Sequence, residues 1–104
     1  MATYERFDES LIEELLNTRS YSEDGVVKYI VSEQTEWADD GEHFDSCWLI
    51  FRELETGYHF CAWITRDREG MVTYPDYCVM VQRVDGIGIN WVPTTIYGGK
   101  AERV

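Results

Sequence analysis

The stretch from Cys47 to Asp67 constrains the fold of this 104-residue chain more than any other. Two apolar, aromatic-rich runs flank Thr56-Gly57, and polar and apolar residues alternate along both of them. Alternation with a period of two is typical of strands that bury one face. The stretch therefore predicts a β-hairpin at the centre of the fold.

The pairing of the two strands follows from the length of the loop. With Thr56 and Gly57 as a two-residue loop, Leu49 faces Ile64 and one side of the hairpin is apolar except near the turn. A three-residue loop with Gly57 as the bulge would instead place His59 opposite Glu53. A slip of one residue would spoil the apolar face, so this face specifies the register.

One helix precedes the hairpin. Asp8 can cap a helix start, and the apolar residues that follow recur at helical spacing: Leu11, Ile12, Leu15 and Leu16. This pattern predicts a helix over residues 9–19 with one apolar stripe.

Further strands surround the hairpin. They are expected over residues 26–32, 77–84 and 87–92. The run of residues 71–74 is short and interrupted by Pro75, which indicates an edge, a bulge or a bend. Residues 21–25 have the composition of a turn, and residues 35–45 of a loop or of two short strand ends around a long turn. Asp85-Gly86 predicts a second hairpin turn, which sets Met80 opposite Trp91.

Together these elements predict a single α+β domain spanning residues 1–104. Its N-terminal helix packs on an antiparallel sheet of about five strands, a β-meander, in two layers. Residues 98–104 are expected to form a loose tail.

The charge of the chain is unusual. The net charge is −11, and residues 1–45 hold thirteen Asp and Glu against three basic residues. A polyanion gains nothing near phosphates, so the charge argues against direct binding to nucleic acid or to an anionic membrane. The expected partner is a basic protein, in particular a nucleic-acid-binding protein.

The acidic side chains could form a partner-binding surface, because carboxylates offer anionic oxygens to Arg and Lys as phosphates do. The candidate residues are Glu33, Glu36, Asp39, Asp40, Glu42 and Asp45, with Glu9, Glu13 and Glu14 as a second row. The competing interpretation is a solvated face that serves only solubility.

In composition and size the chain resembles the small acidic proteins with which bacteriophages and mobile elements block host DNA-handling enzymes. This resemblance implies a non-enzymatic DNA mimic, such as an anti-CRISPR or anti-restriction protein, in the host cytoplasm. An immunity protein that neutralises a basic toxin is a further alternative.

A second candidate surface is aromatic. Trp48 and Trp63 lie on the more polar face of the predicted hairpin and need a cover, which the loop containing Trp37 could provide. A second copy of the chain, as a homodimer, or a partner protein could also cover them. On this interpretation the protein is a small-ligand or peptide-binding module.

The residues that could carry chemistry form no catalytic or metal-binding motif. The acidic residues between Asp39 and Asp45 lack the order of a calcium loop, and neither histidine has a nucleophile at a motif-like spacing. The three cysteines are Cys47, Cys61 and Cys78, an odd number that favours reduced thiols and a cytoplasmic protein. No enzyme activity, metal or cofactor is therefore expected.

Overall fold

The computed structural model describes residues 2–39, 43–86, 88–97 and 100–103. Within them the chain forms one helix, α1 (Glu9–Thr18), and ten strands. The five long strands are β3 (Val26–Gln34), β5 (Phe44–Glu53), β6 (His59–Asp67), β8 (Tyr77–Gly86) and β9 (Gly88–Tyr97). The five short strands are β1 (Tyr4–Arg6), β2 (Ser20–Glu23), β4 (Ala38–Asp39), β7 (Val72–Thr73) and β10 (Lys100–Arg103).

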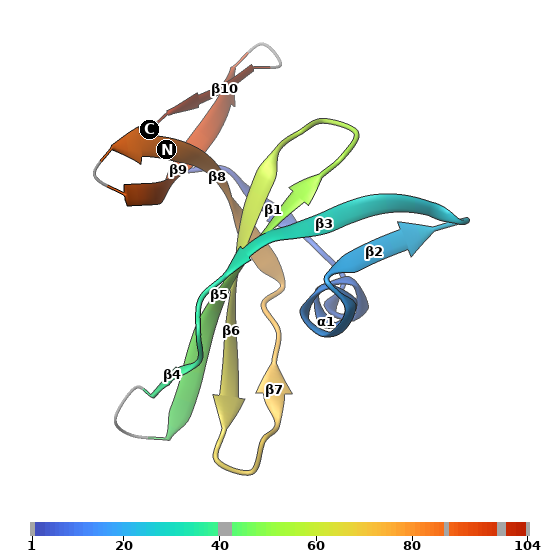
Figure 1. The fold of residues 1–104 in the computed structure, drawn as a ribbon, viewed down its shortest axis with the longest axis vertical. Coiled ribbons are helices and arrows are strands. Elements are labelled where there is room, and N and C mark those ends of the chain that lie inside the picture. The colour runs from blue at the N-terminus through green and yellow to red at the C-terminus, as the bar shows by residue number, and fades with distance from the viewer. Residues whose placement is uncertain (1, 40–42, 87, 98–99, 104) are drawn as a thin grey trace.

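The strands form one antiparallel sheet in the order β10-β9-β8-β6-β5-β3-β2 (Figure 1). The five long strands follow one another as a meander, and β1, β4 and β7 pair with the free parts of β8, β5 and β6. One helix on an antiparallel sheet is confirmed, but the expected number of about five strands is too small. Segments of two to four residues are too short for alternation to reveal them.

The central hairpin has a longer loop than the sequence predicts. Leu49 pairs with Ala62 rather than Ile64, and the loop comprises the four residues 54–57. Gly57 has a φ of +78° and donates its N–H to the carbonyl oxygen of Glu53 at 2.8 Å. A two-residue turn would require Thr56, which is β-branched, to adopt an unfavourable positive φ. The register shift of two residues leaves both faces of the hairpin as predicted, because the side-chain period is two.

The segment of residues 21–25, expected as a turn, is itself part of a hairpin. β2 pairs with β3, and only Asp24 and Gly25 form the loop between them. Both residues have positive φ, 52° and 78°, as the two-residue turn requires. Within residues 35–45, β4 pairs with the start of β5, as the alternative of two short strand ends predicts, and residues 40–42 of the expected turn lie outside the described residues.

The second predicted hairpin has a different register. Trp91 pairs with Arg83 instead of Met80, and the ladder continues to Gly86 and Gly88, with residue 87 outside the described residues. The shift is three residues, an odd number, so it moves Trp91 to the opposite face of the sheet. β9 also continues through Pro93 to pair with β10. Residues 100–103 are therefore a strand rather than a loose tail, and residues 98, 99 and 104 lie outside the described residues.

The helix covers the apolar face of the hairpin and lies beside β2 and β3 (Figure 1). It ends at Thr18, one residue earlier than predicted, where Arg19 has a φ of 70°. Asp8 occupies the N-cap position, but its side chain makes no capping hydrogen bond. The core between helix and sheet contains Phe7, Ile12, Leu15, Cys47, Leu49, Phe51, Phe60, Ala62, Ile64, Cys78 and Met80.

Candidate binding surfaces

The acidic row predicted as the second one lies on the outer side of α1. Glu9, Glu13 and Glu14 are all exposed, because the buried stripe of the helix turns inward through other positions. Burial, together with the charges of Glu13 and Glu9, raises the pKa of Tyr74. The row is therefore next to the segment that joins β7 to β8.

The main predicted acidic group does not form one surface. Glu33, Glu36 and Asp39 are all exposed, but Glu33 accepts a hydrogen bond from Trp91 and Asp45 pairs with Arg66. Asp40 and Glu42 lie outside the described residues. The structure thus distributes the predicted carboxylates over both faces of the sheet.

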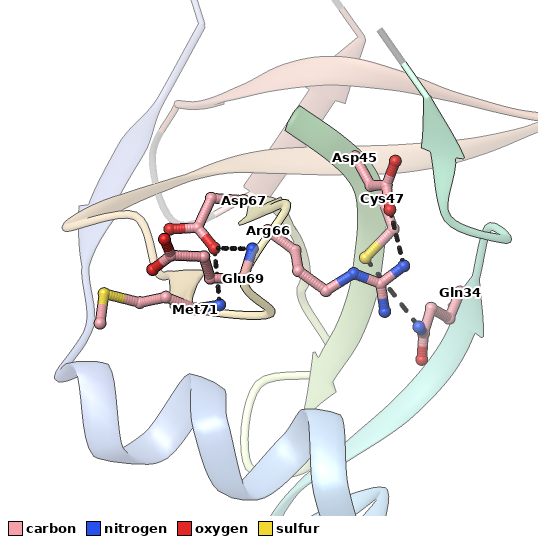
Figure 2. A network of polar contacts seen from close by, with 7 residues as sticks. All are labelled: Gln34, Asp45, Cys47, Arg66, Asp67, Glu69 and Met71. Atoms are coloured by element: carbon pink, nitrogen blue, oxygen red, sulfur yellow. Dashed lines mark hydrogen bonds and ion pairs between the residues drawn. The ribbon is translucent and has the colours of Figure 1, made fainter. Parts of the chain in front are cut away.

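Asp45 belongs to a polar network near the ends of β5 and β6 (Figure 2). Its carboxylate accepts a hydrogen bond of 2.9 Å from Arg66, whose guanidinium lies 4.2 Å from the centre of the Trp37 ring. Beside it, the Asp67 carboxylate accepts the backbone N–H groups of Glu69 and Met71, both at 2.9 Å, and so organises the loop to β7. Through its contact with Arg66, Asp45 is a structural residue as well as a surface charge.

A cavity of about 460 Å³ opens next to this network. Its lining carries both signs of charge and consists of Asp39, His43, Phe44, Asp45, Arg66, Asp67, Arg68 and Gly70. Because the lining includes three aspartates and two arginines, it does not select for one sign of ligand charge.

Another acidic cluster, around Tyr29, was not predicted. The Tyr29 hydroxyl donates a 2.9 Å hydrogen bond to Glu53, and burial and this contact raise the pKa of Tyr29. Burial and then the charge of Glu53 raise the pKa of Glu5, which β1 brings to this side of the sheet. The pairing of β3 with β5 sets Tyr29 opposite Glu53, and the pairing of β1 with β8, which the sequence did not reveal, adds Glu5.

The aromatic face is partly as predicted. Trp48 and Trp63 pair across the hairpin with ring centroids 4.3 Å apart, and they are 44% and 43% exposed. Trp37 does not cover them, because it packs against the core on the helix side, under Arg66. The structure adds Trp91, which the predicted register had placed on the other face.

A groove of about 410 Å³ lies on this face, opposite the helix. Ile50, Cys61 and Val81 are buried and form its floor. The remaining lining residues are Glu33, Thr35, Trp48, Val79, Trp91 and Pro93. A volume of this size, with apolar walls and few polar groups, is typical of ligand-binding sites.

The described residues contain no cluster of three or more His, Cys, Asp or Glu side chains suited to a metal ion. No helix in the described part of the chain has the length and hydropathy needed to cross a bilayer.

The three cysteines are buried and carry free thiols. Burial raises the pKa of both Cys61 and Cys78 to about 12, and it also raises the pKa of Cys47. At pH 8 a thiol with a pKa near 12 is ionised in only about one molecule in ten thousand, against about one in four for a free cysteine.

We therefore expect iodoacetamide at pH 8 to leave all three thiols unmodified in the native protein and to modify all three after unfolding in urea. Mass spectrometry counts the added groups. A thiol that reacts rapidly before unfolding, or an intramolecular disulfide in freshly prepared protein, would contradict this assignment.

Comparisons of the chain with models of protein families, with curated proteins and with solved structures found no match.

Proposed function

We propose that this protein is a small acidic inhibitor that binds a basic, nucleic-acid-handling protein through a carboxylate-rich, nucleic-acid-mimicking surface. The observation that carries the proposal is the position of the acidic residues of the first part of the chain. Glu9, Glu13 and Glu14 on α1 and Glu36 and Asp39 near β4 all expose their side chains, in a chain with a net charge of −11. A basic groove evolved to hold phosphates would attract such a surface over long range.

The specific case we favour is a phage-encoded antagonist of host defence, such as an anti-CRISPR or anti-restriction protein acting in the host cytoplasm. Two features support a binding role without catalysis. The thiols are held protonated by burial, and the best-formed apolar hollow contains one carboxylate and no basic residue in its lining. Neither feature supplies the paired acid and base, or the activated nucleophile, that most enzymes use.

A charge-reversal experiment tests the proposal. Protein immobilised through its N-terminus captures partners from a bacterial lysate, and duplex DNA is then used to elute them. One variant carries Glu9→Lys, Glu13→Lys and Glu14→Lys, and another carries Glu36→Lys and Asp39→Lys. A control, Glu55→Lys with Glu69→Lys, changes the charge of exposed residues outside the acid-rich part.

We expect the wild type to retain basic DNA-binding proteins that duplex DNA releases. The affinity for a retained partner should fall at least tenfold in one of the acidic-row variants and less than threefold in the control, because like charges would then face the partner's basic groove. Association should also slow as salt rises from 50 to 300 mM, since salt screens exposed charges. Equal affinities in all variants would contradict the proposal and show that the acidic residues serve only solubility.

The groove opposite the helix supports a second candidate, a module that binds a peptide or small ligand. Its buried apolar floor lies on the same face as Trp48 and Trp63, which are both nearly half exposed. Exposed aromatic groups beside a hollow are common in interfaces. The charge-reversal variants leave this face unchanged, so they separate the two candidates.

A further inference from the structure

The sheet curls around the groove. Trp91 on β9 donates its indole N–H to the carboxylate of Glu33 on β3, although β8, β6 and β5 lie between these two strands in the sheet. In a flat sheet, strands four positions apart are separated by about 19 Å, because neighbours lie about 4.8 Å apart. A hydrogen bond between the two side chains therefore requires the sheet to bend toward this face, which makes the face concave.

One irregularity in β3 brings Glu33 to this face, where Trp91 lies in the regular ladder of β8 and β9. In β3 the register shifts between Val31, which pairs with Phe51, and Glu33, which pairs with Ile50. Ser32 is thus the extra residue of a β-bulge, and the bulge turns Glu33 from the helix side to the groove. Without it, strict alternation would place Glu33 on the same face as Val31.

The charge in the groove has one sign. Glu33 is the charged member of its lining, and the other lining groups are apolar, aromatic or hydroxyl-bearing. Two basic residues lie beside the groove without lining it: Arg83 is directly opposite Trp91 in the ladder, and Arg52 is opposite His59. The rings of His59 and Trp91 lie in contact, with their centroids 4.8 Å apart. Burial and then the charge of Arg52 lower the pKa of His59, so near neutral pH this histidine adds no positive charge.

We infer that this groove binds an arginine side chain presented by the protein's basic partner, with the guanidinium on Glu33 and against the indole rings of Trp48 and Trp91. The inference rests on the proposed function only for the source of the arginine. The Glu33 carboxylate accepts one hydrogen bond from Trp91 and has lone pairs left for a further donor. A guanidinium is planar, weakly hydrated and able to stack on aromatic rings, so it suits an apolar hollow better than the strongly hydrated ammonium of lysine.

The four indole N–H groups allow a direct test by NMR. The ¹⁵N-labelled protein is titrated with the blocked peptide acetyl-Gly-Arg-Gly-amide, and the same peptide with citrulline, which is neutral and nearly isosteric, is the control. Tryptophan-to-phenylalanine variants assign the signals. The Trp91 and Trp48 signals should move in a saturable way with the arginine peptide, while Trp37, on the helix side under Arg66, should not move.

Two matched variants separate the groove from general attraction. Glu33→Gln and Glu36→Gln each remove one exposed carboxylate from the same segment, but only Glu33 lines the groove. We expect Glu33→Gln and the citrulline peptide each to weaken binding at least fivefold, and Glu36→Gln to weaken it less than twofold. The lysine peptide should bind more weakly than the arginine peptide.

The inference is overturned if the indole signals do not move, if citrulline binds as well as arginine, or if the two Gln variants behave alike. These outcomes are independent of the charge-reversal experiment, which uses other residues. Arginine binding with unchanged partner affinity in the acidic-row variants would remove the proposed nucleic-acid mimicry and retain the groove. The reverse pattern would retain the mimicry and remove the groove.

Discussion

Replacing Phe51 by alanine is expected to lower the free energy of unfolding by about 3–5 kcal/mol. Phe51 is fully buried, and its ring lies 5.1 Å from Phe7 and 5.8 Å from both Tyr29 and Phe60, measured between centroids. These contacts join β3, β5, β6 and the segment before α1, so the cavity left by alanine would lie where four elements meet. Urea titration followed by circular dichroism measures the loss.

Two further variants serve as controls, one at Phe51 itself and one at another position of β5. Phe51→Leu retains most of the apolar volume and should cost less than about 1.5 kcal/mol. Phe44→Ala, at the more exposed start of the same strand, should cost less than Phe51→Ala because its ring is only half buried. If Phe51→Ala lost no more than Phe44→Ala, the aromatic cluster would not be the centre of the core.

Leu15→Ala is the second substitution with a large expected effect, a loss of about 2–5 kcal/mol. Leu15 is fully buried between the helix and the sheet. Alanine is the best helix former, so a loss of stability here would report the packing of α1 rather than its helical propensity. The neighbouring exposed residue provides the control, and Glu14→Ala should stay within about 0.5 kcal/mol of the wild type.

The same urea titration measures this effect, with far-ultraviolet circular dichroism as the check that the folded state is retained. A loss within about 0.5 kcal/mol for Leu15→Ala would place this leucine on the surface. The packing of the helix on the apolar face of the hairpin would then be wrong.

The alternation of apolar residues sufficed to predict which face of the central hairpin is buried. Leu49 pairs with Ala62 instead of Ile64, yet both pairings leave Leu49 on the helix side, because an error of two residues preserves the face. The helix stripe was predictable for the same reason. Apolar periodicity reports burial directly, whereas loop length depends on backbone angles such as that of Gly57.

The groove was not predictable for two reasons. The bulge at Ser32 turns Glu33 to the concave face, and strict alternation along β3 gives no sign of it. Trp91 lies on the same face because β8 and β9 pair in a register three residues from the predicted one, with a ladder that continues to Gly86 and Gly88. The acidic surface was predictable only as a composition, since the fold sends Glu33 and Asp45 to different structural roles.

The proposed acidic row on α1 and the proposed arginine groove lie on opposite faces of the sheet, so one basic partner would have to reach around the sheet to contact both. A protein that handles nucleic acid presents rows of Arg and Lys, and an acidic row could hold several of them while the groove holds one arginine. Long-range attraction would then govern how fast the partner is captured, and the groove would govern how slowly it leaves.

The most direct test of the central claim is the affinity of the captured partner for duplex DNA. Fluorescence anisotropy measures this affinity at fixed salt as the concentration of this protein is increased. If the protein mimics nucleic acid, the apparent Kd for DNA rises in proportion to its concentration, and the acidic-row variant that weakens partner binding reduces this rise at least tenfold. A partner that binds DNA and this protein at the same time, with unchanged affinity for DNA, would contradict the claim.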